Sequence, residues 1–489
     1  MNTKTALIIG AGIGGLATSI RLAIKGYQVK VFEANSYAGG KLTAFEKKGY
    51  RFDAGPSLFT MPHYIDELFK LAGKNPKDHF NYQKMETACH YFWEDGTTFK
   101  AHAETEKFAS EASKTFDVSK SVVLNKLKHA QFLYQKTGKI FMEKSLHKTS
   151  TWLSKDVADA LLHLPKYDLY KTMHQANATL KNPKLTQLFD RYATYNGSSP
   201  YLAPGILNVI PHLEHGIGTF LPHGGMHAIT TSLVQLAKDL GVEFNFNSPV
   251  EKLETNNGKV TGAIINGVVK TADLYVTNMD VVPTYRKLIP QEKALEKTLK
   301  QERSSSALIF YWGIKKDFPQ LDLHNILFSE NYKAEFDHLF QQKTLYHDPT
   351  VYINITSKYE VNDAPKGCEN WFVMINAPAN VGQDWDNMIP IAREQIIQKI
   401  NKILKTDITP LIEVEEILEP RTIESKTSSY QGALYGAASN NKFAAFLRHP
   451  NFNKKLKNLF HVGGSVHPGG GIPLCLLSAK IVDDLTPSA

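Results

Sequence analysis

The apolar residues near the start of the chain change their spacing twice within a short stretch. Residues 7–9 form a continuous apolar run, which is typical of a buried parallel strand. Residues 17–23 then place apolar side chains at helical spacing, and after Gly26 a second apolar run occupies residues 29–32. This order predicts a strand–helix–strand unit of the kind that builds parallel sheets.

A glycine-rich turn joins the first of these strands to the helix. Gly10, Gly12 and Gly15 follow the spacing G-x-G-x-x-G, with Gly14 inside it, and Glu33 ends the second strand 23 residues after Gly10. Glycines let the backbone approach a pyrophosphate at the helix N-terminus, and the acid is placed to accept hydrogen bonds from a ribose diol. We therefore predict a dinucleotide site, which this stretch alone leaves open to NAD or FAD.

The same periodicities predict the rest of the chain in outline. A helix over His63–Ala72 precedes short strands around an Asp95-Gly96 turn, and a helical stretch follows over about 106–200. A helix over 228–240 and strands over 242–280 restore the first pattern. We then expect an aromatic-rich second sheet, with strands at 307–313, 325–328, 351–356, 371–376 and 412–417 and a helix at 388–404. A closing strand at 459–462, a glycine turn and a helix at 474–485 follow.

Three residues of the returning segment are further candidates for the nucleotide site. We expect the backbone of Val250 to contact the adenine. Asn278 and Met279 follow a predicted strand, and sheets of this type bind ligands at the carboxyl ends of their strands.

Composition narrows the class of protein. With 489 residues, 42% hydrophobic and 21% charged, the chain is long enough for two or three globular domains. Cys89, Cys368 and Cys475 are too few and too scattered for a disulfide framework, and we expect no metal site. We see no signal peptide and no apolar run long enough to span a bilayer, so we expect a cytoplasmic protein.

Charge indicates the kind of partner. The net charge of +8 favours an acidic partner, and because no nucleic-acid motif is present, we expect the inner face of the cell membrane rather than nucleic acid. Lys120–Lys155 contains eight lysines and one acid, Glu143, interleaved with apolar residues. This segment is either a peripheral membrane surface or an ordinary solvated helical face, and we weigh the two equally.

Motifs along nearly the whole chain resemble the bacterial phytoene-desaturase-type carotenoid desaturases of the amine oxidase superfamily. A second glycine pair followed by a basic residue, Gly39-Gly40-Lys41, first indicates a flavin rather than NAD, although the family usually has Arg at position 41. The matching stretches are GAGIGGLATSIRLAIKGYQVKVFEANSYAGGK, GYRFDAGPS, FLPHGGMHAI, TNMDVVPTYRKL, SSSALIFYWGI, SYQGALYG and FHVGGSVHPGGGIP.

The resemblance implies noncovalently bound FAD, a long apolar carotenoid substrate and the removal of two hydrogens from it, with the electron acceptor left open. It implies an α/β fold: a discontinuous Rossmann-like FAD-binding domain (1–80, 216–290, 441–489), a helical, membrane-facing substrate region (81–215) and a mixed-sheet substrate domain (291–440). Beyond the first turn, the implied FAD-binding residues are Gly39, Gly40, Lys41, Gly55, Pro56, Ser57, Leu58, Gly464, Gly471, Ile472 and Pro473.

Two motifs resemble a narrower subgroup that acts on the 3,4 bond of 1-hydroxylated acyclic carotenoids. They are RYATYNGSSP at 191–200 and GGMH at 224–227. A hydroxyl that enters an apolar tunnel loses its water and needs partners. Arg191, Tyr192 and Tyr195 are the candidates to orient that hydroxyl or to accept the proton that the substrate loses. A structural role in the core, with ordinary hydrogen bonds, is an alternative for all three.

Other functions share these motifs. Desaturation of phytoene or another carotenoid, redox-neutral isomerisation and a noncatalytic flavin-binding role all stay open. A flavin amine oxidase would share the flavin-binding ends, but its compact polar pocket does not suit the aromatic and aliphatic residues in the middle of this chain.

Overall fold

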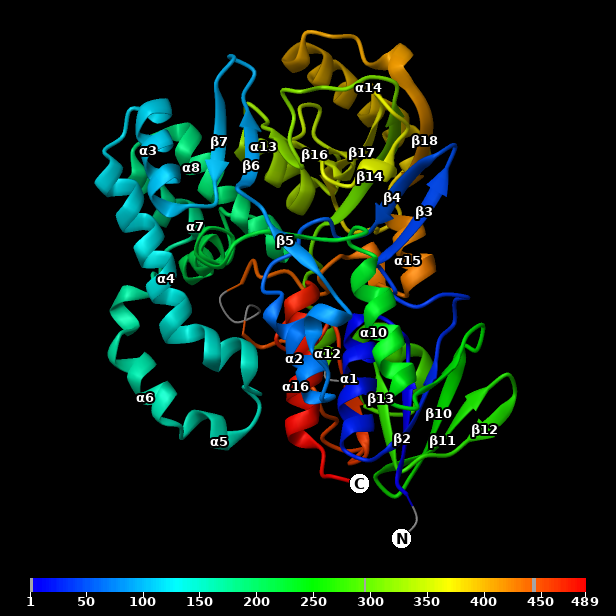
Figure 1. The fold of residues 1–489 in the computed structure, drawn as a ribbon. Helices are drawn as coiled ribbons and strands as arrows, with labels where there is room; N and C mark the ends of the chain where they lie inside the picture. Colours follow the sequence, from blue (N-terminus) through cyan, green and yellow to red (C-terminus); the bar gives the residue numbers. More distant parts are fainter. Residues whose placement is uncertain (1–2, 294–295, 442–445) are drawn as a thin grey trace.

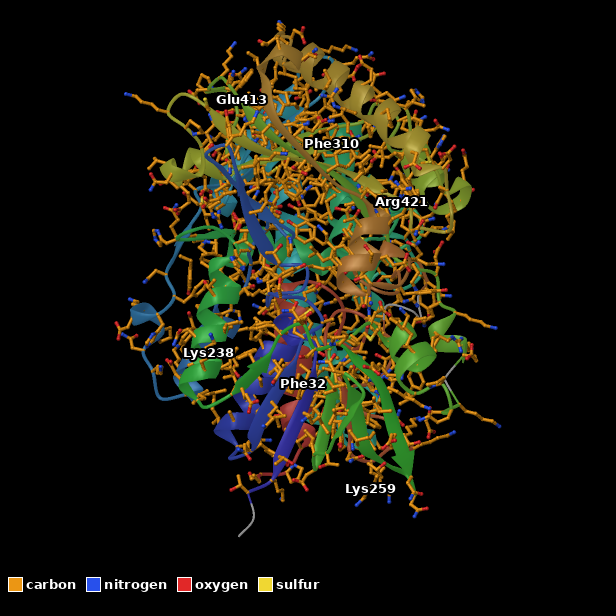
Figure 2. The ribbon with its side chains drawn as sticks, turned by 90° about the vertical axis from the view of Figure 1, so that its right-hand side faces the viewer. Phe32, Lys238, Lys259, Phe310, Glu413 and Arg421 are labelled. Carbon is orange, nitrogen blue, oxygen red and sulfur yellow. The ribbon has the colours of Figure 1, made fainter. Side chains whose placement is uncertain are left out.

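The computed structural model describes residues 3–293, 296–441 and 446–489. Two sheets lie one above the other in Figure 1, and a helical region stands beside them on the left. Figure 2, turned by 90°, shows the same division, with Phe32 in the lower sheet and Phe310 in the upper one. This arrangement confirms the predicted α/β fold with a mixed second sheet.

The lower sheet has five parallel strands contributed by three separate parts of the chain. Helices cover one face, where their apolar stripes meet the sheet, and an antiparallel meander covers the other. The strand order is β19 (Leu459–His461), β13 (Leu274–Thr277), β1 (Thr5–Ile9), β2 (Gln28–Phe32) and β9 (Glu243–Asn245); the helices are α1 (Ile13–Ile24), α2 (His63–Leu71), α10 (Ala228–Asp239) and α16 (Ile472–Leu485); the meander is β10 (Val250–Asn256), β11 (Lys259–Ile265) and β12 (Val268–Lys270).

The upper sheet has seven strands, and α14 (Trp385–Leu404) packs on it through a cluster rich in Trp, Phe and Ile. Its neighbours are antiparallel, except that β15 and β6 are parallel. The order is β18 (Ile412–Leu418), β14 (Ser306–Ile314), β17 (Glu369–Ala377), β16 (Val351–Ile355), β15 (His324–Leu327), β6 (Thr87–Phe92) and β7 (Thr98–His102).

Helices fill most of the stretch between β7 and β8, as the sequence predicts. They are α3 (Thr105–Phe116), α4 (Lys120–Glu143), α5 (Thr149–Trp152), α6 (Lys155–Leu162), α7 (Met173–Asn177), α8 (Pro183–Asp190) and α9 (Ile210–His212). Short elements complete the fold: β3 (Thr43–Lys47), β4 (Tyr50–Ala54), β5 (Tyr82–Lys84), β8 (Phe220–Pro222), α11 (Val281–Pro283), α12 (Glu296–Leu299), α13 (Tyr332–Asp337) and α15 (Pro420–Thr427).

Several predicted helices differ in their bounds. The helix predicted at 388–404 begins earlier, at Trp385. The last helix begins at Ile472 rather than Leu474, because proline is tolerated in a first turn, where its missing N–H has no intrahelical partner. Before β8, the chain forms a 3-10 turn over Gly205–Val209, the short α9 and a π turn over Leu213–Ile217.

The basic segment is partly packed into the helical region. Lys126 is buried, with its ammonium 5.7 Å from the centre of the Phe189 ring, and burial lowers its pKa to about 8. Lys136 pairs with Asp159, and Lys144 pairs with Asp156, both on α6. One face of α4 is thus packed in the helical region, while Lys128 and Lys139 lie exposed on the other face, which leaves the membrane interpretation of the segment a prediction. Among the described residues, no helix is long and apolar enough to cross a bilayer.

Candidate active site

A cavity of about 900 Å³ lies where the two sheets and the helical region meet. Its wall includes residues from the first glycine turn, the end of β13, the turn before α16 and the upper sheet. Most of the predicted FAD-binding residues line it: Gly12, Gly14, Gly39, Gly40, Lys41, Gly55, Pro56, Ser57, Leu58, Asn278, Gly464, Gly471, Ile472 and Pro473. Gly10, Gly15, Glu33, Val250 and Met279 are not on this wall.

The first glycine turn is too tight for side chains. A Cβ at Gly15 would lie 2.1 Å from the carbonyl oxygen of Gly10, and one at Gly12 would lie 2.6 Å from Nδ2 of Asn278. Gly39 donates its N–H to the carbonyl of Ala11 at 2.8 Å, so the second glycine pair packs directly on the first turn. Within the described chain no side chain caps α1, which leaves its first N–H groups for an anionic ligand.

Glu33 supports this turn from behind the cavity. Its Oε2 accepts a hydrogen bond from the N–H of Ala11 at 2.7 Å, and Oε1 accepts two from Asn35 at 2.9 Å. A carboxylate has room for further donors, so these contacts do not prevent the predicted ribose contact. Val250 begins β10, two residues after Ser248, whose N–H donates to the carbonyl of Glu33.

Two cations, the half-buried Lys41 and the buried Arg448, add positive charge to the cavity wall. The Lys41 ammonium donates to the carbonyls of Ala433 and Leu434 at 3.3 and 2.9 Å, and burial lowers its pKa. Arg448 is 3% exposed and has no carboxylate partner among the described residues. Burial and the charge of Arg303 lower the pKa of Arg448 to about 10. Sequence analysis missed Arg448, which lies outside every recognised motif.

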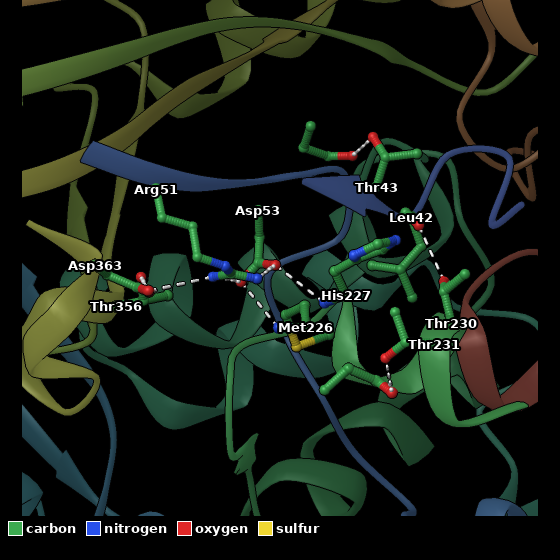
Figure 3. Close-up of polar contacts among 12 residues, drawn as sticks. Leu42, Thr43, Arg51, Asp53, Met226, His227, Thr230, Thr231, Thr356 and Asp363 are labelled. Atoms are coloured by element: carbon green, nitrogen blue, oxygen red, sulfur yellow. Dashed lines mark hydrogen bonds and ion pairs between the residues drawn. The ribbon is translucent and has the colours of Figure 1, made fainter. Parts of the chain in front are cut away.

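Figure 3 shows how two of the sequence motifs meet. Asp53 accepts hydrogen bonds from the N–H groups of Met226 and His227 at 2.8 and 3.0 Å, and Arg51 pairs with Asp53 at 2.8 Å and with Asp363 at 3.2 Å. The GYRFDAGPS and GGMH motifs are therefore two sides of one buried network. This network holds the loop at Gly55 against the cavity.

A second polar cluster lies deeper, around Glu214. Arg191 donates to both oxygens of Glu214 at 3.2 and 3.1 Å, and its guanidinium lies 4.6 Å from the centre of the Tyr192 ring. Tyr192 and Tyr195 also donate to Glu214. Burial opposes ionisation of Glu214, but the charges of Arg191 and His215 prevail and lower its pKa to about 2.

The contacts of Tyr192 and Tyr195 limit the roles predicted for these residues from the sequence. Arg191 and Tyr195 line the cavity, but the hydroxyl of Tyr192 is turned to Glu214 and to His215, 2.8 Å away, and Tyr192 is not on the wall. The two tyrosine hydroxyls are already paired. Nε of Arg191 has no partner in the described chain, so Arg191 keeps spare donor capacity.

Glu214 was not singled out from the sequence. It is the acid inside the apolar stretch ILNVIPHLEHGIG, and an isolated acid among apolar residues is the available signal. Its partners Arg191, Tyr192 and Tyr195 lie 19 to 23 residues away, and only the tertiary fold brings them together.

The site fits FAD on structural grounds. Glycines that exclude side chains, an uncapped helix N-terminus and the cations Lys41 and Arg448 suit a long anionic dinucleotide. The upper part of the wall contains aromatic and aliphatic residues, including Phe141, Ile206 and Ile326, which suit an apolar substrate beside it.

Comparison with known proteins agrees with this site. Residues 13–482 match the family model described as flavin containing amine oxidoreductase. The chain is 61% identical over 485 residues to a 1-hydroxycarotenoid 3,4-desaturase of Flavobacterium sp. (strain P99-3), covering 99% of both chains. It is 32% identical to a 4,4'-diapolycopene oxygenase of Methylomonas sp., covering 99% of this chain and 98% of that one.

Solved structures share the fold at low identity. An oxidoreductase from Methanosarcina mazei has a TM-score of 0.63 at 15% identity, covering 98% of this chain and 100% of the other. A putrescine oxidase bound to putrescine has a TM-score of 0.62 at 12% identity, covering 98% of each chain. From the family match and the site that fits its cofactor, the chain belongs to the flavin containing amine oxidoreductase family and is an FAD-dependent oxidoreductase.

Proposed function

We propose that this enzyme introduces a carbon–carbon double bond into an acyclic carotenoid, at the 3,4 position of a 1-hydroxylated substrate. The relative that is 61% identical over 99% of the chain carries the name of that reaction. The structural observation that supports the proposal is a polar cluster around Arg191 on the wall of a cavity otherwise suited to a polyene. When bound, FAD supplies the acceptor for two electrons and one proton.

The polyene would lie along the apolar part of the wall. Gly138 and Phe141 of α4 face the cavity together with Ile206 and Val209, and Phe141 packs with Phe446 at 4.6 Å between ring centres. Such a wall excludes water and offers little to hold a polyene in one register. A polar contact at the substrate's hydroxyl would provide that register.

Arg191 and Tyr195 then act in binding and orientation at the cavity wall, Tyr192 supports them through Glu214, and none of the three acts as a base. A guanidinium is cationic, and burial raises the pKa of Tyr192 and of Tyr195 well above the ordinary value, so all three are protonated at neutral pH. Glu214 carries the negative charge of this cluster and lines the cavity; because its pKa is low it is a weak base, so we propose that it directs the second proton away rather than holding it.

The decisive experiment compares substrates. We expect kcat/KM for a 1-hydroxylated acyclic carotenoid to exceed that for its unhydroxylated parent by at least tenfold, because a site with polar partners rejects an analogue that leaves them unpaired. In Tyr195→Phe this ratio should fall. The product should be two hydrogens lighter by mass spectrometry.

Other outcomes would favour the alternatives. Equal efficiency on both substrates would leave a general carotenoid desaturase, a product of unchanged mass would indicate an isomerase, and added oxygen would indicate an oxygenase like the 32% identical relatives. Turnover of a diamine would contradict the proposal altogether.

We also propose that the enzyme works as a peripheral protein on the inner face of the cell membrane. Beyond α4, several large apolar side chains face solvent: Trp152 is 49% exposed, Leu153 83%, Leu161 55%, Leu162 80% and Leu164 40%. Exposed lysines surround them at positions 148, 155 and 166. We name Trp152, Leu153, Leu161, Leu162 and Leu164 the α5–α6 patch; its mixture of apolar and basic residues suits an anionic lipid surface.

The position of the α5–α6 patch supports this proposal. The opposite face of α6 packs through Val157 and Ala160 into a cluster that also contains Ile206, which lines the cavity. A carotenoid dissolved in the membrane would therefore have a short apolar path to the cavity past α4.

A further inference from the structure

His324 is a buried residue to which the proposed reaction assigns no role. It begins β15, lines the cavity and is 3% exposed. Its Nε2 is buried and has no hydrogen-bond partner in the part of the chain that the structure describes. Buried polar groups are normally paired, so an unpaired nitrogen on a cavity wall points to a ligand atom.

The hydrogen bonds at the other ring nitrogen determine where the proton resides. Nδ1 of His324 lies 3.2 Å from Nδ2 of Asn354, and this same amide nitrogen donates to the carbonyl of Leu323 at 3.0 Å. The carbonyl fixes the orientation of the amide, and an amide NH₂ can only donate. Nδ1 of His324 is therefore an acceptor.

The hydroxyl of Tyr352, 2.7 Å from Nδ1, then donates to it as well. Tyr352 in turn accepts from the hydroxyl of Ser57 at 2.9 Å. Burial lowers the pKa of His324 to about 4, so the ring is neutral at neutral pH and its proton resides on Nε2. His324 thus presents an unpaired N–H donor rather than a base.

This donor lies among groups that select the kind of acceptor. Arg191 and Glu214, which line the same cavity, neutralise each other as an ion pair. The wall therefore offers no net charge there to hold an ionic ligand, and a neutral oxygen suits the donor. We propose that His324 is a specificity-determining residue whose Nε2–H donates to the hydroxyl oxygen of the substrate; this rests on the proposed function.

The substrate's own chemistry agrees with this position. In a 1-hydroxylated chain that reacts at its 3,4 bond, one carbon separates the hydroxyl-bearing carbon from the reacting bond, so the oxygen lies within roughly 4 Å of it by ordinary bond lengths. The hydroxyl must therefore bind beside the flavin. Ser57, at the start of the chain Ser57–Tyr352–His324, is one of the residues predicted to contact FAD.

The experiment uses the purified holoenzyme and two variants of one position. His324→Leu removes the donor, and His324→Gln restores an N–H donor at a similar reach. We expect His324→Leu to lower the kcat/KM ratio of hydroxylated to parent carotenoid at least tenfold, with FAD content unchanged, and His324→Gln to recover most of the ratio. His461→Leu is the matched control, because His461 is also a buried histidine with unpaired nitrogens but is not on the cavity wall.

Binding provides a readout that does not need turnover. The absorption shift of each carotenoid on titration with oxidised holoenzyme should show the same preference, lost in His324→Leu and kept in His461→Leu. If the wild type binds the hydroxylated carotenoid preferentially but desaturates neither, the proposed reaction fails and the inference about His324 stands. A preference that survives in His324→Leu, disappears equally in His461→Leu, or is absent from the wild type would overturn the inference.

Discussion

Glu335 illustrates how burial at a single residue controls the pH dependence of stability. It accepts hydrogen bonds from the N–H and the hydroxyl of Thr350 at 3.2 and 2.7 Å, while its Oε1 has no partner in the described chain. Burial raises its pKa to about 7, against the opposing effects of Thr350 and the charge of Lys399. The folded protein therefore holds a proton there that the unfolded chain releases near pH 4.5.

The direction of this pH dependence follows from the linkage between proton binding and folding. Because the folded-state pKa is raised, the stability that Glu335 contributes is fully present below about pH 4.5 and is lost as pH rises through about 7. We expect Glu335→Gln to remove this loss, so that at pH 8 the variant is more stable than the wild type by on the order of 3 kcal/mol. Thermal unfolding from pH 5 to 8 checks this, with the exposed Glu330→Gln as control. Parallel pH profiles for wild type and Glu335→Gln would contradict it.

At the residue scale, sequence alone predicted local patterns and missed distant partners. Gly12 and Glu33 belong to a motif whose spacing sets their roles, so their neighbourhood was foreseeable. The pairing of Arg191 with Glu214, and of His324 with Asn354, depends on how separate elements pack. The sequence could therefore single out Arg191 but could not show that its carboxylate partner was 23 residues away.

At the scale of elements, the Arg51–Asp53 network joins the β3–β4 hairpin to α10. Asp53 is buried and accepts from the N–H groups of Met226 and His227, the two residues that precede α10 (Figure 3). We expect Asp53→Ala to cost about 2–4 kcal/mol, because it leaves two N–H groups without their acceptor and leaves Arg51 with Asp363 as its remaining carboxylate partner. FAD should also be released at a lower temperature, since the loop at Gly55 follows directly.

An exposed ion pair provides the matched control. Arg421 pairs with Asp386 at 2.8 Å, and both side chains are exposed, so Asp386→Ala should change stability by about 1 kcal/mol or less. Chemical denaturation and the fluorescence of released FAD measure both effects. If Asp53→Ala behaves like Asp386→Ala, the network does not hold the hairpin to α10.

The basic helix shows why elements can be predicted while their surroundings cannot. A helical, basic stretch was evident in the sequence, and the first part of that stretch is α4, which runs from Lys120 to Glu143. The acids that neutralise its lysines, Asp156 and Asp159, come from α6 and are invisible to a count over the helix itself.

At the scale of the whole molecule, the α5–α6 patch predicts reversible membrane binding. Leu153 and Leu162 are almost fully exposed, and burying each in lipid would contribute about 1.5–3 kcal/mol. We expect the double variant Leu153→Ser/Leu162→Ser to reduce sedimentation with anionic liposomes at least tenfold, and the wild type to bind less as salt rises.

A control variant separates liposome binding through the α5–α6 patch from the general effect of replacing an exposed apolar side chain. Val361 is 78% exposed and lies outside the helical region, so Val361→Ser should leave liposome binding unchanged. Size-exclusion chromatography without lipid checks that no variant aggregates. Equal binding by the wild type and the double variant, or no dependence on lipid charge, would rule out the patch as the membrane surface.

The overall architecture was more predictable than its connections. Two strand–helix–strand patterns and a closing glycine turn imply one parallel sheet, which the structure contains. The parallel pairing of β15 with β6 adds the hairpin β6–β7 to the edge of a sheet whose other strands come much later in the chain. This pairing has no local signal in the sequence, because strand register between distant segments depends on tertiary packing.

The order β19-β13-β1-β2-β9 also has a consequence during protein synthesis. β13 ends at Thr277, whereas its outer neighbour β19 begins at Leu459. A ribosome that adds about 5–20 residues per second needs roughly 10–40 s to cover that interval. Throughout it, β13 forms an unpaired sheet edge, the kind of surface that recruits other chains. The nascent enzyme is thus most exposed to aggregation just before its nucleotide site is complete, and a chaperone that covers this edge would act in that interval.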